Sequence, residues 1–265
     1  MPAAAFEVNN NRLLASLPMQ DSERWRSCLE AVALVTGQVL HEARHAARFA
    51  YFPIGAVVSM QLPSNDGACD EVALVGHEGM VGISTFMGSV SYLRAVVQRP
   101  GPALRMNADR MRAEAESSTA VLRLLLQYVA TWEAHIALGV VCNRHHNLQQ
   151  RLALRLLLGM DRQQDSRLAI THEQLAVLLG VRRESVTEEA RRLQNAGLIR
   201  YARGRIAVLD PTALAQRSCS CLSLLTGGWQ HSEPGDNPAT VPTFHASHTQ
   251  PHREHNGDPD AARAW

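Results

Sequence analysis

The spacing of apolar residues changes character several times along the chain. Residues 10–30 hold two short helical patterns: "NRLLASL", which ends at Pro18, and "ERWRSCLE", for which Asp21 or Ser22 is available as the cap. From Val32 to Met106 the apolar residues fall instead into short β-forming runs, which are AVALV, RFAYFP, AVVSMQL, DEVALVG, YLRAVVQ and PALRM. These runs predict a small antiparallel β-roll, of the double-stranded β-helix or jelly-roll type.

A hairpin turn is predicted within this region at Ser64–Gly67, "SNDG", because Asn, Asp and Gly tolerate positive φ. A second turn is expected in "HEARHAARFAYFP", where Ala43 and Arg44 occupy the bend. An arginine at a positive-φ position would be strained, so either Arg44 carries that strain or the turn has another shape.

A long helix is predicted from about Ser118 to Cys142, a segment without proline. Apolar residues recur along it at alternating spacings of three and four: Leu122, Leu125, Val129, Trp132 and Ile136. This heptad spacing is typical of a narrow stripe that faces a partner helix. About 25 residues at 1.5 Å each make a rod of roughly 37 Å, which is long for a small roll. We therefore predict a homodimer interface, and the alternative is packing of the stripe against the chain's own roll.

Two capped helices follow. Asn147 with Gln150, and Thr171 with Gln174, each form a capping-box pattern. Gly180 then supplies a tight turn before the segment that contains the most arginine in the chain.

The segment after Gly180, "VRRESVTEEARRLQNAGLI", predicts a helix whose buried face is Val186, Ala190 and Leu193. Gly197 ends this helix, and "LIRYARGRIAVLD" predicts a β-hairpin with Arg203 and Gly204 at its tip. The order of elements predicts a helix-turn-helix with a β-wing, whose second helix fits the DNA major groove.

The distribution of charge supports a polyanionic partner. The chain's net charge is only +1, and all 26 of its basic Lys/Arg residues are arginine. Residues 144–217 hold 13 arginines against 7 acidic residues, whereas residues 1–143 hold 11 against 13 and residues 218–265 hold 2 against 5. One basic segment in an otherwise neutral chain indicates nucleic acid. The alternative is a solvated helical hairpin whose glutamates pair with Arg191 and Arg192.

The predicted DNA-binding residues lie on the second helix, its preceding turn and the wing. They are Thr171, Arg182, Arg183, Glu184, Ser185, Thr187, Glu188, Arg191, Arg203 and Arg205, with Arg200 as a further wing cation. Arginine suits guanine because its fork matches O6 and N7, and glutamate accepts from the cytosine amino group. Wing arginines are expected on phosphates, where they add affinity without sequence choice.

The sequence of a roll, a long helix and a winged helix-turn-helix resembles the CRP/FNR family of bacterial transcription regulators over about residues 10–217. The stretches that carry the resemblance are "AYFPIGAVVSM", "EVALVGHEGMVG", "RAVVQ", "VVCNRHHNLQQRLALRLLL" and "RRESV". The resemblance implies an α+β chain with a sensor roll at 10–117, a dimerisation helix at 118–143 and a DNA-binding domain at 144–217. It further implies a homodimer on a palindromic operator, contact with RNA polymerase, and Arg183 and Glu184 as a base-reading pair.

The resemblance places an effector in the roll, and the nearest matches to the family's cyclic-nucleotide motif are Glu78, Gly79 and Arg94. The order Glu-Gly is reversed and Ala95 lacks the hydroxyl found after the family's arginine, so a cyclic nucleotide is disfavoured and we expect no resident cofactor. An iron–sulfur cluster is disfavoured because no cysteine precedes Cys28. Haem stays open, with His41, His45 and His77 as axial candidates.

Residues 218–265 lose hydrophobic periodicity and gain Pro, Gly and histidine, which predicts a disordered tail. Cys219 and Cys221 lie at its start, and the tail's histidines are His231, His245, His248, His252 and His255. No metal site is predicted, but these residues define an alternative function, a metal- or thiol-responsive binding protein.

Other classes of protein fit the sequence less well. A ligand-binding module that never touches DNA would leave the basic wing unexplained. No nucleophile elbow, P-loop or dinucleotide fingerprint is found, so we expect no enzyme. Five scattered cysteines, no secretory pattern in "MPAAAFEVNNN" and no apolar run near 20 residues predict a cytoplasmic protein without a membrane partner.

Overall fold

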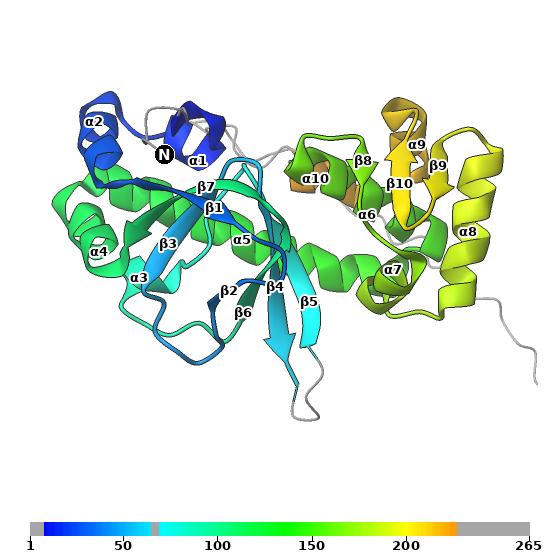
Figure 1. Ribbon diagram of the computed structural model, residues 1–265, viewed down its shortest axis with the longest axis horizontal. Helices are drawn as coiled ribbons and strands as arrows, with labels where there is room; N and C mark the ends of the chain where they lie inside the picture. The colour runs from blue at the N-terminus through cyan, green and yellow to red at the C-terminus, as the bar shows by residue number, and fades with distance from the viewer. Residues whose placement is uncertain (1–7, 65–68, 227–265) are drawn as a thin grey trace, which may run out of the picture. The chain divides into compact units, whose positions relative to one another are not determined.

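The computed structural model describes residues 8–64 and 69–226, and its architecture is the predicted α+β arrangement (Figure 1). The N-terminal elements are η2 (Val8–Asn10), α1 (Arg12–Ala15) and α2 (Met19–Cys28). The roll comprises β1 (Glu30–Leu34), β2 (Val39–His41), β3 (Phe49–Pro53), β4 (Val57–Pro63), β5 (Cys69–Val75), α3 (Ser84–Met87), β6 (Arg94–Arg99), β7 (Gly101–Asn107) and α4 (Ala108–Ser117).

The remaining elements are the long helix and the C-terminal domain. They are α5 (Thr119–His145), α6 (Leu148–Gln163), β8 (Arg167–Leu168), α7 (His172–Leu179), α8 (Arg183–Asn195), β9 (Ile199–Ala202), β10 (Arg205–Val208), α9 (Pro211–Arg217) and α10 (Cys221–Thr226). The predicted disordered tail is wrong for residues 221–226, because they form α10 with Cys221 and Leu225 buried, so the folded chain extends further than the sequence predicts. The rest of the predicted tail, from residue 227, lies outside the described residues.

Two antiparallel sheets form the roll, in the strand orders β1-β7-β3 and β2-β6-β4-β5. All six predicted strands are present. One further strand, β2, was not predicted, and it pairs with β6. Inward residues of the strands, including Val58, Val75 and Val97, form one buried core with Tyr51. β4 and β5 pair as the predicted hairpin, while the turn residues 65–68 lie outside the described residues.

The turn at Arg44 has the strained form considered above, with φ of 62°. The amide of Arg44 donates to the carbonyl of Ser91 at 2.6 Å, so a hydrogen bond to a distant loop holds the position. Tertiary contact therefore offsets the steric cost of a side chain in the left-handed region.

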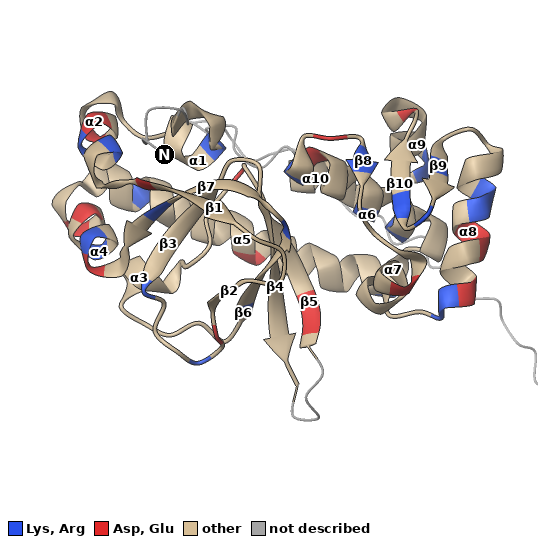
Figure 2. Ribbon diagram, viewed as in Figure 1, with Lys and Arg blue, Asp and Glu red and all other residues tan. Residues whose placement is uncertain are grey.

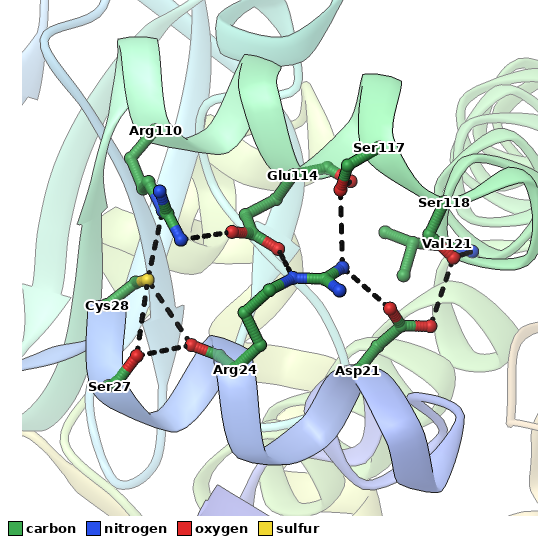
Figure 3. A network of polar contacts seen from close by, with 9 residues as sticks. All are labelled: Asp21, Arg24, Ser27, Cys28, Arg110, Glu114, Ser117, Ser118 and Val121. Atoms are coloured by element: carbon green, nitrogen blue, oxygen red, sulfur yellow. Dashed lines mark hydrogen bonds and ion pairs between the residues drawn. The ribbon is translucent and has the colours of Figure 1, made fainter.

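Helix α2 begins earlier than its sequence suggested, at Met19 with Pro18 as the N-cap residue. Asp21 does not cap it, because its carboxylate is buried and accepts from Arg24 at 2.6 Å and from the Ser118 hydroxyl at 3.0 Å. Figure 3 shows the network that results, in which Arg24 also pairs with Glu114, and Arg110 donates to the other oxygen of Glu114 at 2.7 Å. These charges join α2, α4 and the start of α5.

Helix α5 is buried on one side only, and this corrects the predicted dimer stripe at two of its five residues. Leu125 is only 1% exposed and belongs to the core of its own chain, while Trp132 packs against the roll. Val129 and Ile136 are half-buried on the same side. Leu125 therefore cannot contact a second chain, whereas Leu122 of the predicted stripe is 37% exposed.

Beside the buried side of α5 runs a row of exposed, mostly apolar side chains, which includes Leu122 of the predicted stripe. Its members share one side of the helix at spacings of three and four; they are Leu122, Leu126, Ala130, Glu133, Ala137 and Val140. Over an 18-residue window α5 has a mean hydropathy of 1.3, and 17% of that window is buried. By length and composition alone α5 could cross a membrane, contrary to our expectation that no run comes near that length, but an interfacial helix has the same properties.

The buried carboxylate of Glu114 gives a test of the network in Figure 3. Its side chain is 3% exposed and bridges two guanidinium groups. We expect Glu114→Gln to lower the free energy of unfolding by about 1–3 kcal/mol, because buried hydrogen bonds to charged groups are lost. Asp109→Asn is the control, since Asp109 is 90% exposed and its pair with Arg112 is long at 3.7 Å. Equal losses in urea denaturation of the two variants would contradict this account.

Candidate nucleic-acid interface

Two capped helices and a glycine turn build the surface. Thr171 and Gln174 form the predicted capping box at the start of α7, as Asn147 and Gln150 do for α6. Gly180 ends α7 with φ of 61°, a left-handed conformation that glycine adopts without steric cost. Arg182 is then the N-cap residue of α8.

The inner face of α8 fixes how the helix is rotated. Val186, Ala190 and Leu193 are at most 2% exposed and lie in the core of the C-terminal domain, as predicted. The outer face carries charged side chains that are exposed; they are Arg182, Arg183, Glu184, Glu188 and Arg191. Figure 2 shows cationic and acidic segments alternating along α8. Ser185 is half-buried at the edge of this surface.

Ion pairs between side chains of α8 neutralise part of this charge. Arg192 pairs with Glu188 at 2.6 Å and with Glu189 at 2.7 Å, as the alternative reading of the helix proposed. Arg183, whose side chain is 65% exposed, has only a long contact of 3.8 Å with Glu173. Exposed pairs contribute about 0–1 kcal/mol each, so they can be exchanged for a nucleic-acid contact at small cost.

Thr187 differs from its predicted role. Its hydroxyl donates to the carbonyl of Arg183 at 3.0 Å, which leaves the oxygen to accept from Nδ1 of His172, also at 3.0 Å. The His172 ring in turn stacks on Tyr201, with centroids 3.9 Å apart. The hydroxyl of Thr187 is therefore engaged within the domain, while the half-buried residue still borders the outer surface of α8 beside Arg183 and Glu188.

His172 is a structural residue of the site that the sequence did not single out. It contacts α8 through Thr187 and the wing through Tyr201, from the first position of α7. Burial, followed by the charge of Arg183, lowers the pKa of His172 below its ordinary value. A histidine after a capping threonine has no distinctive sequence signal, because its partners lie 15 and 29 residues further along the chain.

The wing is a two-stranded hairpin with the predicted tip. Arg203 and Gly204 have φ of 48° and 76°, as a tight hairpin turn requires. The register pairs Ala207 with Arg200 and Ala202 with Arg205, so both arginines lie on the outer face and are exposed. A Cβ at Gly204 would lie 3.4 Å from the Thr171 methyl group, which places the wing tip beside the start of α7.

The residues predicted to bind an effector do not share a site. Glu78 is buried, accepts from the amide of Gly76 and pairs with Arg162 of α6 at 3.1 Å. Arg94 pairs instead with Glu42 at 3.0 Å. Gly79 is packed so closely that a Cβ there would lie 2.5 Å from the Tyr128 ring. The structure therefore gives these three residues structural partners in place of the predicted shared ligand.

A separate cavity of about 250 Å³ lies between the roll and α5. Its lining is mostly apolar and includes Met60, Met80, Val129 and Trp132, with His41 as its one ring capable of protonation. Burial lowers the pKa of His41, so the neutral ring predominates at neutral pH. Of the other haem candidates, His77 is buried and His45 is exposed, and neither lines this cavity.

Comparison with known protein families also identifies a helix-turn-helix in the C-terminal domain. Residues 150–217 match the Crp-like helix-turn-helix domain. No curated protein matches the chain in sequence.

About three quarters of the chain shares its fold with solved transcription regulators. FixK2 from Bradyrhizobium japonicum superposes with a TM-score of 0.63 at 15% identity, over 72% of this chain and 98% of that protein. A CRP/FNR-family regulator from Thermus thermophilus gives 0.58 at 20% identity, over 75% and 100%. The c-di-GMP-responsive regulator CLP from Xanthomonas campestris gives 0.56 at 15%, over 73% and 100%.

The buried ring of His172 makes the stability of the C-terminal domain depend on pH. Because the folded state lowers its pKa, its effect on stability is complete above the ordinary value of about 6.5 and is lost as pH falls below it. We expect the wild type to lose more unfolding free energy than His172→Gln between pH 7.5 and 5.5. Urea denaturation of both proteins at the two pH values measures this, and parallel losses would refute it.

Proposed function

Because residues 150–217 are a Crp-like helix-turn-helix domain within the fold of CRP/FNR transcription regulators, we propose that the chain is a homodimeric, sequence-specific DNA-binding regulator. The observation that carries the proposal is the orientation of α8. Its inner face is buried at Val186, Ala190 and Leu193, and its outer face presents arginine and glutamate beside an arginine-bearing wing.

In this proposal, the side chains of the first turns of α8 contact the DNA bases. Arg183 is exposed and loosely held, so its guanidinium is available to O6 and N7 of a guanine. Glu184, next to it and exposed, has the acceptor that a cytosine amino group requires. The neighbouring Arg182 and Arg191 extend the cationic surface along the groove.

Phosphate contact belongs to the wing. Arg200 and Arg205 share its outer face and Arg203 stands at its tip. These cations supply affinity that does not depend on base sequence and that falls with salt.

Dimerisation belongs to the exposed row of α5 that begins at Leu122 and Leu126. This helix is apolar but largely uncovered in a single chain, and a second copy of the same row would remove that surface from water. Two copies of α8 would then enter successive major grooves of a palindromic operator, about 34 Å apart.

Regulation belongs to the cavity between the roll and α5. A ligand there would contact Trp132 and Val129 directly, and so could favour one arrangement of the dimer helix over another. The protein would act in the cytoplasm, without a membrane partner, and would contact RNA polymerase from its operator. No part of this role requires an enzymatic activity.

A pair of arginine variants tests the division between base and phosphate contacts. We expect Arg183→Ala to weaken binding to the preferred operator by about 1–3 kcal/mol and to relax base choice. We expect Arg203→Ala to weaken binding to all sequences alike and to flatten the salt dependence. Fluorescence anisotropy on the operator selected from random DNA, and on bulk competitor, measures both.

Arg112→Ala is the matched control for this pair, since Arg112 lies on α4 outside the C-terminal domain and is exposed. Equal loss on operator and competitor for Arg183→Ala would remove its base-reading role. Absence of any preferred duplex for the wild-type protein would reject the proposed function itself.

The exposed row of α5 gives an independent test. Leu126 is 50% exposed, so Leu126→Glu leaves the core of the chain intact. We expect it to convert the dimer to monomers, because it buries two unpaired carboxylates at the interface. Light scattering after size exclusion measures the mass, and Leu62→Glu, at a residue of β4 that is 47% exposed, is the control. An unchanged dimer mass in Leu126→Glu would place the interface elsewhere.

A further inference from the structure

We infer that Cys142, His146, Cys219 and Cys221 form a binding site for a thiophilic divalent cation, with Zn²⁺ as the ion of choice. The two residues from the end of α5 meet the two from the segment after α9. One ligand atom from each of the four lies within 4.8 Å of all the others.

The distances between donor atoms fit a tetrahedral ion. The Sγ atoms of Cys142 and Cys219 are 3.6 Å apart, and Sγ of Cys221 lies 3.8 Å from Nδ1 of His146. Zinc binds sulfur at about 2.3 Å and histidine nitrogen at about 2.0–2.1 Å, so tetrahedral ligands are separated by roughly 3.5–3.8 Å. A disulfide would instead bring two sulfurs to about 2.05 Å.

Local structure aims these side chains at one point. Cys142 and His146 are four residues apart at the last turn of α5, with His146 as its C-cap residue, so they lie on the same side of the helix. Cys219 lies in the short connection after α9, and Cys221 is the first residue of α10. Neither half of the site contains enough ligands alone, so the site depends on the tertiary fold.

The surroundings suit a structural ion. The three cysteines are at most 5% exposed and His146 is half-buried. Leu154 and Leu225 are buried in the same cluster, which keeps solvent from the sulfur atoms. Three thiolates and one imidazole are soft donors, which select zinc over magnesium or calcium, and four protein ligands leave no open position for catalysis.

The position of the site gives the ion a defined mechanical role. Cys142 and His146 precede the winged domain in the chain, and Cys219 and Cys221 follow it. A bound ion would therefore close residues 147–218 into a loop, and would fasten α10 against α5 and α6 at the point where the dimer helix ends.

Metal content of the full-length protein tests the inference. We expect about one zinc per chain by mass spectrometry of protein purified under reducing conditions, and loss of this zinc in Cys142→Ser and Cys219→Ser. Cys69→Ser is the matched control, because Cys69 is a half-buried thiol on β5 outside the cluster. A metal chelator should lower the Tm of the wild type and of Cys69→Ser by several degrees.

Cobalt provides a readout that does not depend on folding of the variants. Added to metal-stripped, reduced wild-type protein, Co²⁺ should produce the thiolate charge-transfer and intense visible bands of a tetrahedral sulfur site. Metal that persists in both cysteine variants and gives no thiolate band would belong to the tail histidines and would overturn the inference. So would wild-type protein that binds neither ion, or an intact mass showing Cys142 and Cys219 joined as a disulfide under the same conditions.

Discussion

The burial of one face of α8 is the constraint on which the interface depends. Val186, Ala190 and Leu193 cannot leave the domain core without a loss of several kcal/mol, so the rotation of the helix about its axis is fixed. Arg183 and Glu184 face outward as a consequence of that burial. His172 adds a second restraint, since it bonds to Thr187 of α8 and stacks on Tyr201 of the wing. The two elements that would contact DNA are thus held by the same imidazole.

Helix α5 is a second element that is fixed on one side only. Its inner face is fastened to the roll by Leu125 and by Tyr128, whose hydroxyl donates to the carbonyl of Met80 at 2.8 Å and accepts from the amide of Met80 at 3.0 Å. Its outer face carries the row from Leu122 to Val140. The cavity beside Trp132 is therefore lined by the same continuous helix that carries the proposed dimer interface.

Features that depend on residues close together in the chain were predicted better than features that depend on distant residues. Capping boxes at Asn147 and Thr171, the left-handed Gly180 and the hairpin tip at Arg203 depend on residues within a few positions, and all were predictable. Spacing also identified the buried face of α8. On α5 the same reasoning misplaced Leu125, because periodicity identifies a helix face but not which surface covers it.

Long-range partners account for the other errors. Asp21 has the sequence context of a helix cap, but Ser118 engages it from 97 residues away. Glu78 has the context of an effector ligand, but Arg162 pairs with it from the C-terminal domain. The thiols of Cys142 and Cys219 are 77 residues apart in the chain, so the spacing of the cysteines alone indicated no shared site.

Two ion pairs join α6 to the roll. Arg155 pairs with Glu71, and Arg162 pairs with Glu78, all four side chains being at most 17% exposed. Buried pairs of this kind contribute little net stability, because desolvation offsets their attraction, but removal of one partner leaves an uncompensated charge. In the proposed regulator, a movement of α6 away from the roll would require both of these pairs to separate.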